Sequence, residues 1–160
     1  MDSLIIPDLA MLRRWLDQSG IYFFECNSCQ ALHLPHMQSF DGVFDAKVDL
    51  LDNVILCSAL AEVKPTTLIP LVASLSLINA SSLTVKAFVD IQDDNLPKLI
   101  VSQSLNIAVG VKLEQFTHFM QQSKEQISMV ILEALANDLL YISDEEESPS
   151  GFESQPVLLH

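Results

Sequence analysis

Residues 43–63 read VFDAKVDLLDNVILCSALAEV, two apolar runs on either side of the dipeptide Asp52-Asn53. Asp and Asn tolerate the positive φ angles of tight hairpin turns, so this stretch predicts two antiparallel strands joined by a two-residue turn. The first run places Phe44, Ala46, Val48 and Leu50 in alternation with Asp45, Lys47 and Asp49. Because side chains of a strand alternate between its faces, this pattern predicts one buried and one solvated face.

Helix and strand patterns continue on both sides of this hairpin. Upstream we expect a helix over residues 7–20 and two strands, 21–26 and 30–37, joined across Asn27-Ser28. Downstream we expect a helix over 66–79, strands over 83–91 and 98–109, and a long helix over 112–139. The resulting order, α-ββ(ββ)-α-ββ-α, predicts an α+β domain in which the helices pack on an antiparallel sheet.

The three helices are predicted from apolar residues that recur at helical spacing. Leu9, Leu12 and Leu16 form the stripe of the first helix, and Leu68, Leu71, Val72, Leu75 and Ile78 form that of the second. In the last helix the buried face is predicted to consist of Phe116, Phe119, Met120, Ile127, Ile131 and Ala134. Met129, Val130, Leu132 and Leu135 widen this face, so we expect much of the last helix to be covered.

Composition places these elements in one acidic domain with a distinct C-terminal segment. The chain has 160 residues, 49% of them hydrophobic, and a net charge of −13. From about Ser143 it reads SDEEESPSGFESQPVLLH, in which no basic residue offsets the acids. Such a segment buries too little apolar surface to offset the entropy of ordering it. We therefore expect a single domain over residues 1–141 and a flexible acidic tail over 142–160.

The charge pattern and the apolar runs exclude several classes of partner. Only eight basic residues occur, and they are scattered along the chain, whereas nucleic-acid binding needs a clustered positive surface. No apolar run approaches the roughly 20 residues of a membrane span. The N-terminus carries its arginines after an apolar stretch, the reverse of a signal peptide. We expect a cytoplasmic protein that binds neither nucleic acid nor membranes, and whose three cysteines are free thiols.

The stretch CNSCQALHLPH, residues 26–36, holds the only concentration of metal-binding residue types, namely Cys26, Cys29, His33 and His36. A closed zinc site needs four nitrogen or sulfur ligands around one ion. With Asn27-Ser28 as a two-residue turn, Cys26 would face Cys29, and both would share a face with His33. His36 would point to the other face unless Pro35 kinks the strand.

Three interpretations of this stretch remain open. Two small thiols can flank a turn with no further role, the four residues can bind zinc, or the facing cysteines can form a disulfide under oxidation. We favour the first interpretation and predict no metal and no cofactor. The thiols lack the helix N-terminus that activates thioredoxin-type cysteines.

No other pattern in the sequence indicates catalysis. The sequence has no P-loop, no nucleophile elbow and no dinucleotide-binding glycines. Asp41, Asp45, Asp90, Asp93 and Asp94 do not follow the spacing of a calcium-binding loop, and we interpret them as turn-forming acids. The residue inventory therefore predicts a protein that is not an enzyme.

Three long stretches resemble the YbjN family, the AmyR/YbjN-type bacterial regulators. They are FFECNSCQALHLPHMQSFDGVFDAKVDLLDN, INASSLTVKAFVDIQDDNLPKLIVSQSL and EQFTHFMQQSKEQISMVILEA. With the first helix, the resemblance covers about residues 1 to 140. It implies a fold similar to that of the small acidic chaperones of type III secretion. It also implies a regulator that dampens exopolysaccharide production, motility and virulence functions and influences stress responses, and it supplies no catalytic residues.

Three functional hypotheses follow. The first is a regulator that binds another protein. The second is a type III secretion-type chaperone for an effector, which would act as a dimer. The third is a metal or redox sensor built on Cys26, Cys29 and His33. The sequence leaves the oligomeric state open between monomer and dimer.

Overall fold

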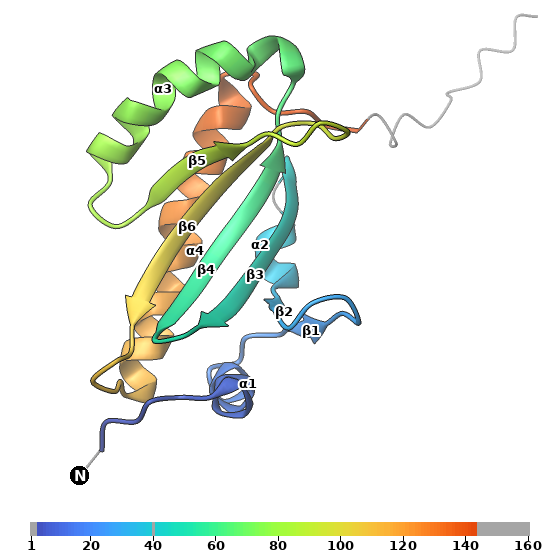
Figure 1. Ribbon diagram of the computed structural model, residues 1–160. Helices are drawn as coiled ribbons and strands as arrows, with labels where there is room; N and C mark the ends of the chain where they lie inside the picture. Colours follow the sequence, from blue (N-terminus) through green and yellow to red (C-terminus); the bar gives the residue numbers. More distant parts are fainter. Residues whose placement is uncertain (1–2, 40, 144–160) are drawn as a thin grey trace, which may run out of the picture.

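A six-stranded antiparallel sheet with helices packed on it forms the body of the protein (Figure 1). The computed structural model describes residues 3–39 and 41–143. The strands are β1 (Phe24–Glu25), β2 (Leu32–His33), β3 (Val43–Leu51), β4 (Val54–Glu62), β5 (Lys86–Asp90) and β6 (Lys98–Asn106), ordered β1-β2-β3-β4-β6-β5 across the sheet. The predicted α+β class is confirmed.

The β3–β4 hairpin has the predicted pairing and turn. Leu51 pairs with Val54 across the turn, and Asp52 adopts a φ of 51°. Ala46 and Val48 are fully buried against the helices, as expected. Phe44, however, is 60% exposed, and its predicted burial was wrong. The register shifts between Val43 and Asp45, and such a bulge disturbs the alternation of side chains at the start of the strand.

The first two strands are much shorter than predicted, and their register differs. Phe24 pairs with His33 and Glu25 with Leu32, so the connection is a loop over residues 26–31 and not a two-residue turn. The predicted pairing of Cys26 with Cys29 was therefore wrong. The strand expected over 30–37 ends at His33, because α2 (Pro35–Gln38) begins with a proline, whose fixed φ suits a first helical turn.

The longer helices lie close to their predicted positions. They are α1 (Leu9–Gln18), α3 (Leu68–Ser81) and α4 (Leu113–Ala136), with a 3₁₀ turn, η1 (Pro65–Thr67), before α3. The first helix begins two residues later than predicted, because the carboxylate of Asp8 accepts a hydrogen bond from the Met11 backbone N–H and so caps it. A cap at this position satisfies one of the unpaired N–H groups of the first turn.

Helix α4 covers the sheet, with contacts to β4 and β6, and runs behind it in Figure 1. All six residues predicted for its buried face are buried. The predicted widening was partly wrong, because Met129 and Leu132 are 63% and 46% exposed. The helix side of the sheet and the facing helices together form one continuous core.

The second predicted helix, α3, packs mainly against β5 at the edge of the sheet. Leu71 is its only fully buried residue. The side-chain amide of Asn79 donates to the backbone carbonyl of Ala87 and accepts from the Ala87 N–H, at 2.9 and 2.8 Å. The amide therefore supplies hydrogen-bond partners for the backbone N–H and carbonyl of Ala87 on the outer edge of β5, where no further strand pairs.

No helix in the described ranges combines the length and apolar character needed to cross a bilayer. The predicted acidic tail, residues 142–160, lies outside the described residues except for Ile142 and Ser143.

Candidate functional site

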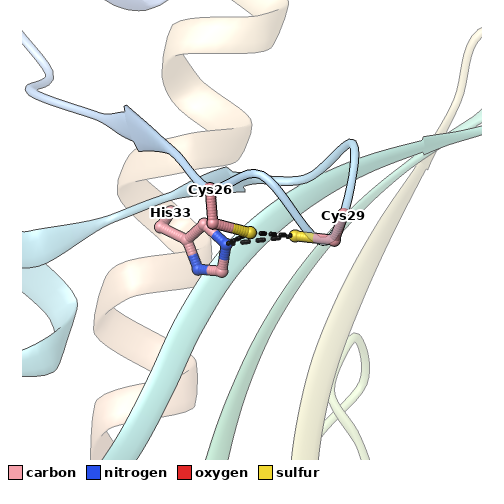
Figure 2. Close-up of side chains that lie close together, drawn as sticks. All are labelled: Cys26, Cys29 and His33. Carbon is pink, nitrogen blue, oxygen red and sulfur yellow. Dashed lines mark hydrogen bonds between the residues drawn. The ribbon is translucent and has the colours of Figure 1, made fainter.

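Three of the four residues considered as metal ligands meet beside the first strands of the sheet. Cys26 and Cys29 lie in the loop between β1 and β2, and His33 lies on β2. We call Cys26, Cys29 and His33 the dithiol–imidazole cluster (Figure 2). His36 is not part of it, since it lies on α2, where burial and then the nearby Lys124 lower the pKa of its imidazole.

The polar atoms of the cluster are in direct contact. The two Sγ atoms are 2.8 Å apart, and Nε2 of His33 lies 3.2 Å from Cys29 Sγ and 3.3 Å from Cys26 Sγ. The hydroxyl of Ser28 lies 3.3 Å from Cys26 Sγ, within the same loop. The imidazole nitrogen therefore faces both sulfurs at once, as Figure 2 shows.

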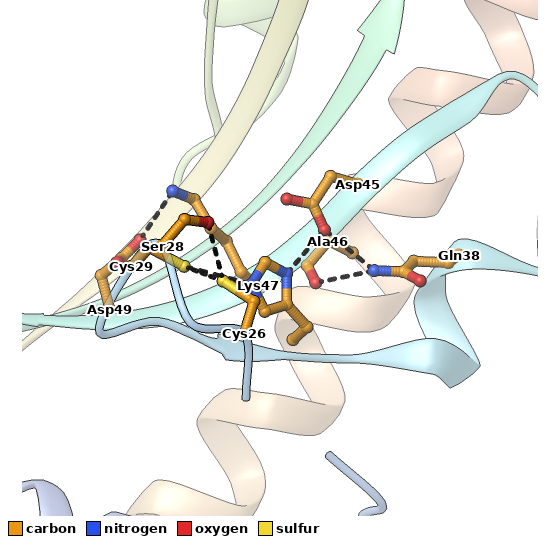
Figure 3. Close-up of polar contacts among 9 residues, drawn as sticks. Cys26, Ser28, Cys29, Gln38, Asp45, Ala46, Lys47 and Asp49 are labelled. Carbon is orange, nitrogen blue, oxygen red and sulfur yellow. Dashed lines mark hydrogen bonds and ion pairs between the residues drawn. The ribbon is translucent and has the colours of Figure 1, made fainter. Parts of the chain in front are cut away.

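The imidazole is held in this orientation from its other side. Nδ1 of His33 lies 2.9 Å from Oδ1 of Asp45 on β3, and the same carboxylate oxygen accepts a hydrogen bond from the Gln38 amide at 2.9 Å (Figure 3). An ionised carboxylate only accepts hydrogen bonds, so we assign a proton to Nδ1. The ring of Phe24 stacks on the imidazole, with centroids 5.0 Å apart. His33 is consequently only 8% exposed.

These contacts shift the pKa values of the two thiols in opposite directions. The pKa of Cys26 falls to about 6, chiefly because the Cys29 thiol donates to it and further because Ser28 and His33 stabilise its thiolate. The same contact raises the pKa of Cys29. Desolvation lowers the pKa of His33, but its hydrogen bonds to Asp45 and Cys26 outweigh this and raise the pKa overall. The cluster therefore favours a thiolate at Cys26 at neutral pH.

A groove of about 410 Å³ lies beside the cluster on the face of the sheet away from α4. His33 pairs with Lys47 across β2 and β3, so both side chains lie on this open face. Lys47 lines the groove and forms an ion pair with Asp49 at 3.6 Å. Lys47 also acts on the cluster, since its positive charge favours the Cys29 thiolate.

The two sulfurs lie closer together than two thiolate ligands of one zinc ion would lie. Two thiolates around one tetrahedral zinc, each about 2.3 Å from the ion, lie about 3.8 Å apart. Here the two sulfurs are 1 Å closer than that. In the described part of the chain, the group of potential ligand atoms contains three residues and no fourth. Asp45 occupies the far side of His33 and reaches the sulfurs only through the imidazole ring.

Sequence reasoning found the three cluster residues but missed those that orient them. Cys26, Cys29 and His33 lie together as predicted, although the predicted strand register was wrong. The register differs by two residues, and a shift of two leaves each strand side chain on the same face of the sheet. Asp45 was interpreted as a turn acid, whereas it lies on β3 and contacts His33. Its place on the solvated face of the alternating strand was the available indication. Gln38 and Phe24 gave no comparable indication.

Chemically, the arrangement supplies a nucleophile, an imidazole and an orienting carboxylate, with a second thiol beside the nucleophile. The thiol, the imidazole and the carboxylate are arranged as in sites where a base activates a nucleophile and a third group orients the base. The second thiol distinguishes this cluster, since an adduct formed on Cys26 is open to displacement by Cys29 at contact distance. Such a pair suits reversible thiol chemistry.

Comparison with known proteins identifies relatives over most of the chain. Residues 8–135 match the YbjN family, described as "Putative bacterial sensory transduction regulator". The chain is 66% identical over 146 residues to "Uncharacterized protein YbjN" of Escherichia coli K12, a match that covers 91% of this chain and 92% of the relative. The Shigella flexneri protein matches to the same extent.

A solved structure shows the same fold. The crystal structure of YbjN from E. coli, described there as a putative transcription regulator, matches with a TM-score of 0.86 and 67% sequence identity. The match covers 88% of this chain and all of the crystallised chain. The family match over residues 8–135 includes all six strands and the loop that carries the two cysteines.

Proposed function

Because the chain belongs to the YbjN family, we propose that it is a non-enzymatic regulator that acts in the cytoplasm by binding another protein. The processes we propose for it are those that the resemblance implies: exopolysaccharide production, motility and virulence functions, which it would dampen, and stress responses. We also propose that residues 1–141 act as one domain, with residues 142–160 as an acidic tail.

The observation that supports protein binding is the exposed apolar face of α3. Ile69 and Leu77 are 81% and 73% exposed, and Val72 is also exposed. No charged residue occurs between Lys64 and Lys86, a segment that contains the whole helix. A helix that is apolar on all sides is normally buried, but α3 buries only the side that faces β5 and the core.

The charge of the chain favours this face as the docking surface. With a net charge of −13, most of the surface repels acidic partners, whereas an uncharged helix does not. Contiguous exposed apolar residues commonly mark sites of protein interaction. We propose that the occupant is a different protein, which receives Ile69, Val72 and Leu77 in an apolar groove, the helix-in-groove mode of recognition.

The non-enzymatic assignment rests on the family description and on the arrangement of the cluster. The nucleophile of the cluster contacts a second thiol, and it lies in the loop between β1 and β2. An acyl or similar intermediate on Cys26 would be exposed to capture by Cys29. The cluster therefore favours thiol chemistry on the protein itself.

The experiment compares capture of partners by three forms of the full-length chain. Wild type, the double variant Ile69→Asp/Leu77→Asp and the control Val109→Asp are used as bait in a native lysate. Val109 is 85% exposed in the turn between β6 and α4, far from α3 in Figure 1, so the control makes one apolar-to-Asp change away from the proposed docking surface. We expect one stoichiometric partner with wild type and the control, and at least a tenfold loss with the double variant.

The alternatives give different outcomes in the same experiment. Equal capture by the double variant contradicts docking on α3. A homodimer in light scattering that the double variant dissociates would assign the face to a second copy of the chain. If that dimer also retains a secreted effector, the type III secretion-type chaperone replaces the regulator. The three forms can also be expressed in a deletion strain. If wild type and Val109→Asp restore exopolysaccharide control and the double variant does not, docking is connected to the proposed processes.

A further inference from the structure

The dithiol–imidazole cluster has three properties that protein binding through α3 does not require. Its two thiols are in contact, both face an oriented imidazole, and both are reachable from solvent. Cys57 lacks all three, since it is fully buried on the helix side of β4. In reduced proteins, thiols with these properties are the ones that oxidants attack first.

We propose that Cys26 is a site of oxidation by hydroperoxides, and that Cys29 resolves the product into a Cys26–Cys29 disulfide. The inference stands on the geometry of the cluster alone. It is independent of whether α3 binds a partner, and it names a chemical signal to which a sensory regulator could respond.

The first step consumes one equivalent of peroxide. The Cys26 thiolate attacks one peroxide oxygen, so that an S–O bond forms while the O–O bond breaks. Sulfur is oxidised to a sulfenic acid, and the departing hydroxide or alkoxide takes a proton and leaves as water or an alcohol. Nε2 of His33 lies 3.3 Å from the reacting sulfur, and in the imidazolium form it is placed to donate that proton.

The second step uses the neighbouring thiol. Cys29 Sγ attacks Cys26 Sγ, the S–S bond forms as the S–OH bond breaks, and water leaves with the proton of Cys29. In total, two thiols and one hydroperoxide give one disulfide, one water and one water or alcohol molecule. Because the sulfurs are already 2.8 Å apart, resolution requires movement of side chains in the 26–31 loop and no separation of strands. A dithiol reductant reverses the change by exchange.

Asp45 and Gln38 act as positioning residues for this chemistry. Asp45 holds the imidazole from β3 and Gln38 holds Asp45 from α2, so the reacting nitrogen is fixed by two elements outside the loop. The loop also joins the outermost strand of the sheet, because β1 pairs only with β2. Oxidation would therefore constrain the segment that connects this edge strand to the rest of the sheet.

The test treats purified, reduced, full-length chain with hydrogen peroxide or cumene hydroperoxide and follows each cysteine by mass spectrometry. We expect a loss of two hydrogens per chain, a Cys26–Cys29 linkage and an unmodified Cys57. With Cys29→Ser, Cys26 should accumulate as a sulfenic acid that dimedone traps, and with Cys26→Ser no oxidation should occur. At pH 6, Cys26 should react roughly tenfold faster in the folded than in the denatured chain, once its lower intrinsic nucleophilicity is included.

Two controls separate this chemistry from a structural or metal-binding role. His33→Gln should slow oxidation of Cys26 while the folded circular dichroism spectrum is retained. Stoichiometric zinc in protein purified without chelator, with both thiols protected from peroxide, would overturn the proposal in favour of a metal site. Oxidation of Cys26 no faster than in the denatured chain would also overturn it. All of these measurements use the protein alone, so their failure is distinct from failure to find a partner for α3.

Discussion

Removing the Cys29 thiol should raise the pKa of Cys26 towards its ordinary value. Cys29 makes the largest contribution to the low pKa of Cys26, about 6, through the contact at 2.8 Å between their sulfurs. In Cys29→Ala this donor is lost, and the pKa should rise towards the ordinary value of about 8.5. Cys29→Ser retains a hydroxyl donor and should produce a smaller rise.

The expected effect is large when it is expressed as a rate of alkylation, which follows the thiolate fraction. For a pKa of about 6, the thiolate fraction, and with it the rate, increases only about twofold between pH 6 and pH 8. For a pKa of about 8.5, the same interval gives an increase of about 75-fold. The wild type should follow the first profile, and Cys29→Ala should move towards the second.

The assay is pulse alkylation with iodoacetamide between pH 5 and pH 9, followed by quantification of each cysteine-containing peptide. Cys57 is an internal control, because burial raises its pKa to about 12 and it should remain unmodified in the folded chain. His33→Gln should raise the midpoint of Cys26 less than Cys29→Ala does, since His33 contributes less than Cys29 and Ser28. A wild-type midpoint near 8.5, or an unchanged midpoint in Cys29→Ala, would refute the reasoning from contact geometry.

Three further predictions concern stability. Gly110→Ala should lower the free energy of unfolding by about 1–3 kcal/mol more than Gly20→Ala in urea titrations. Both glycines have positive φ, but only at Gly110 would a Cβ lie 2.9 Å from a side-chain carbon of the N-terminal segment; equal losses would contradict this. Leu71→Ala should cost about 2–5 kcal/mol by the same measurement, whereas Leu77→Ala should cost almost nothing, because the first side chain is fully buried and the second is 73% exposed. For His36, burial lowers the folded-state pKa below its ordinary 6.5, so its contribution to stability is complete above pH 6.5 and is lost as the pH falls through the folded-state pKa. Between pH 7.5 and pH 5, the melting temperature of the wild type should therefore fall further than that of His36→Gln. Parallel curves of melting temperature against pH for the two proteins would exclude this effect.

Local patterns predicted the central part of the fold because local physics determines it. The dipeptide Asp52-Asn53 and the alternation in residues 43–51 specify a hairpin without reference to the rest of the chain. The six buried positions of α4 follow from helical periodicity alone. The errors occurred where neighbouring elements decide the outcome, as at Phe44, whose exposure depends on a bulge in the pairing with β4.

The candidate site was predictable only in part. Three of its residues lie within eight positions of the chain, so their chemistry was visible as a motif. Their orienting partners come from β3 and α2, which the sheet and a proline-initiated helix bring to the imidazole. No spacing rule connects Asp45 to His33, because cross-strand neighbours depend on register.

The amino-acid sequence alone determined the antiparallel hairpin, the helical stripes, the acidic charge and the presence of two thiols and an imidazole in one short stretch, because each depends on residues close together along the chain. Tertiary structure alone decided that Asp45 and Gln38 orient the imidazole from other elements, and that one side of an uncharged helix stays in solvent. These features depend on strand register and packing between distant segments. A single chain encodes such contacts only through the sum of all its interactions, and no local pattern records them.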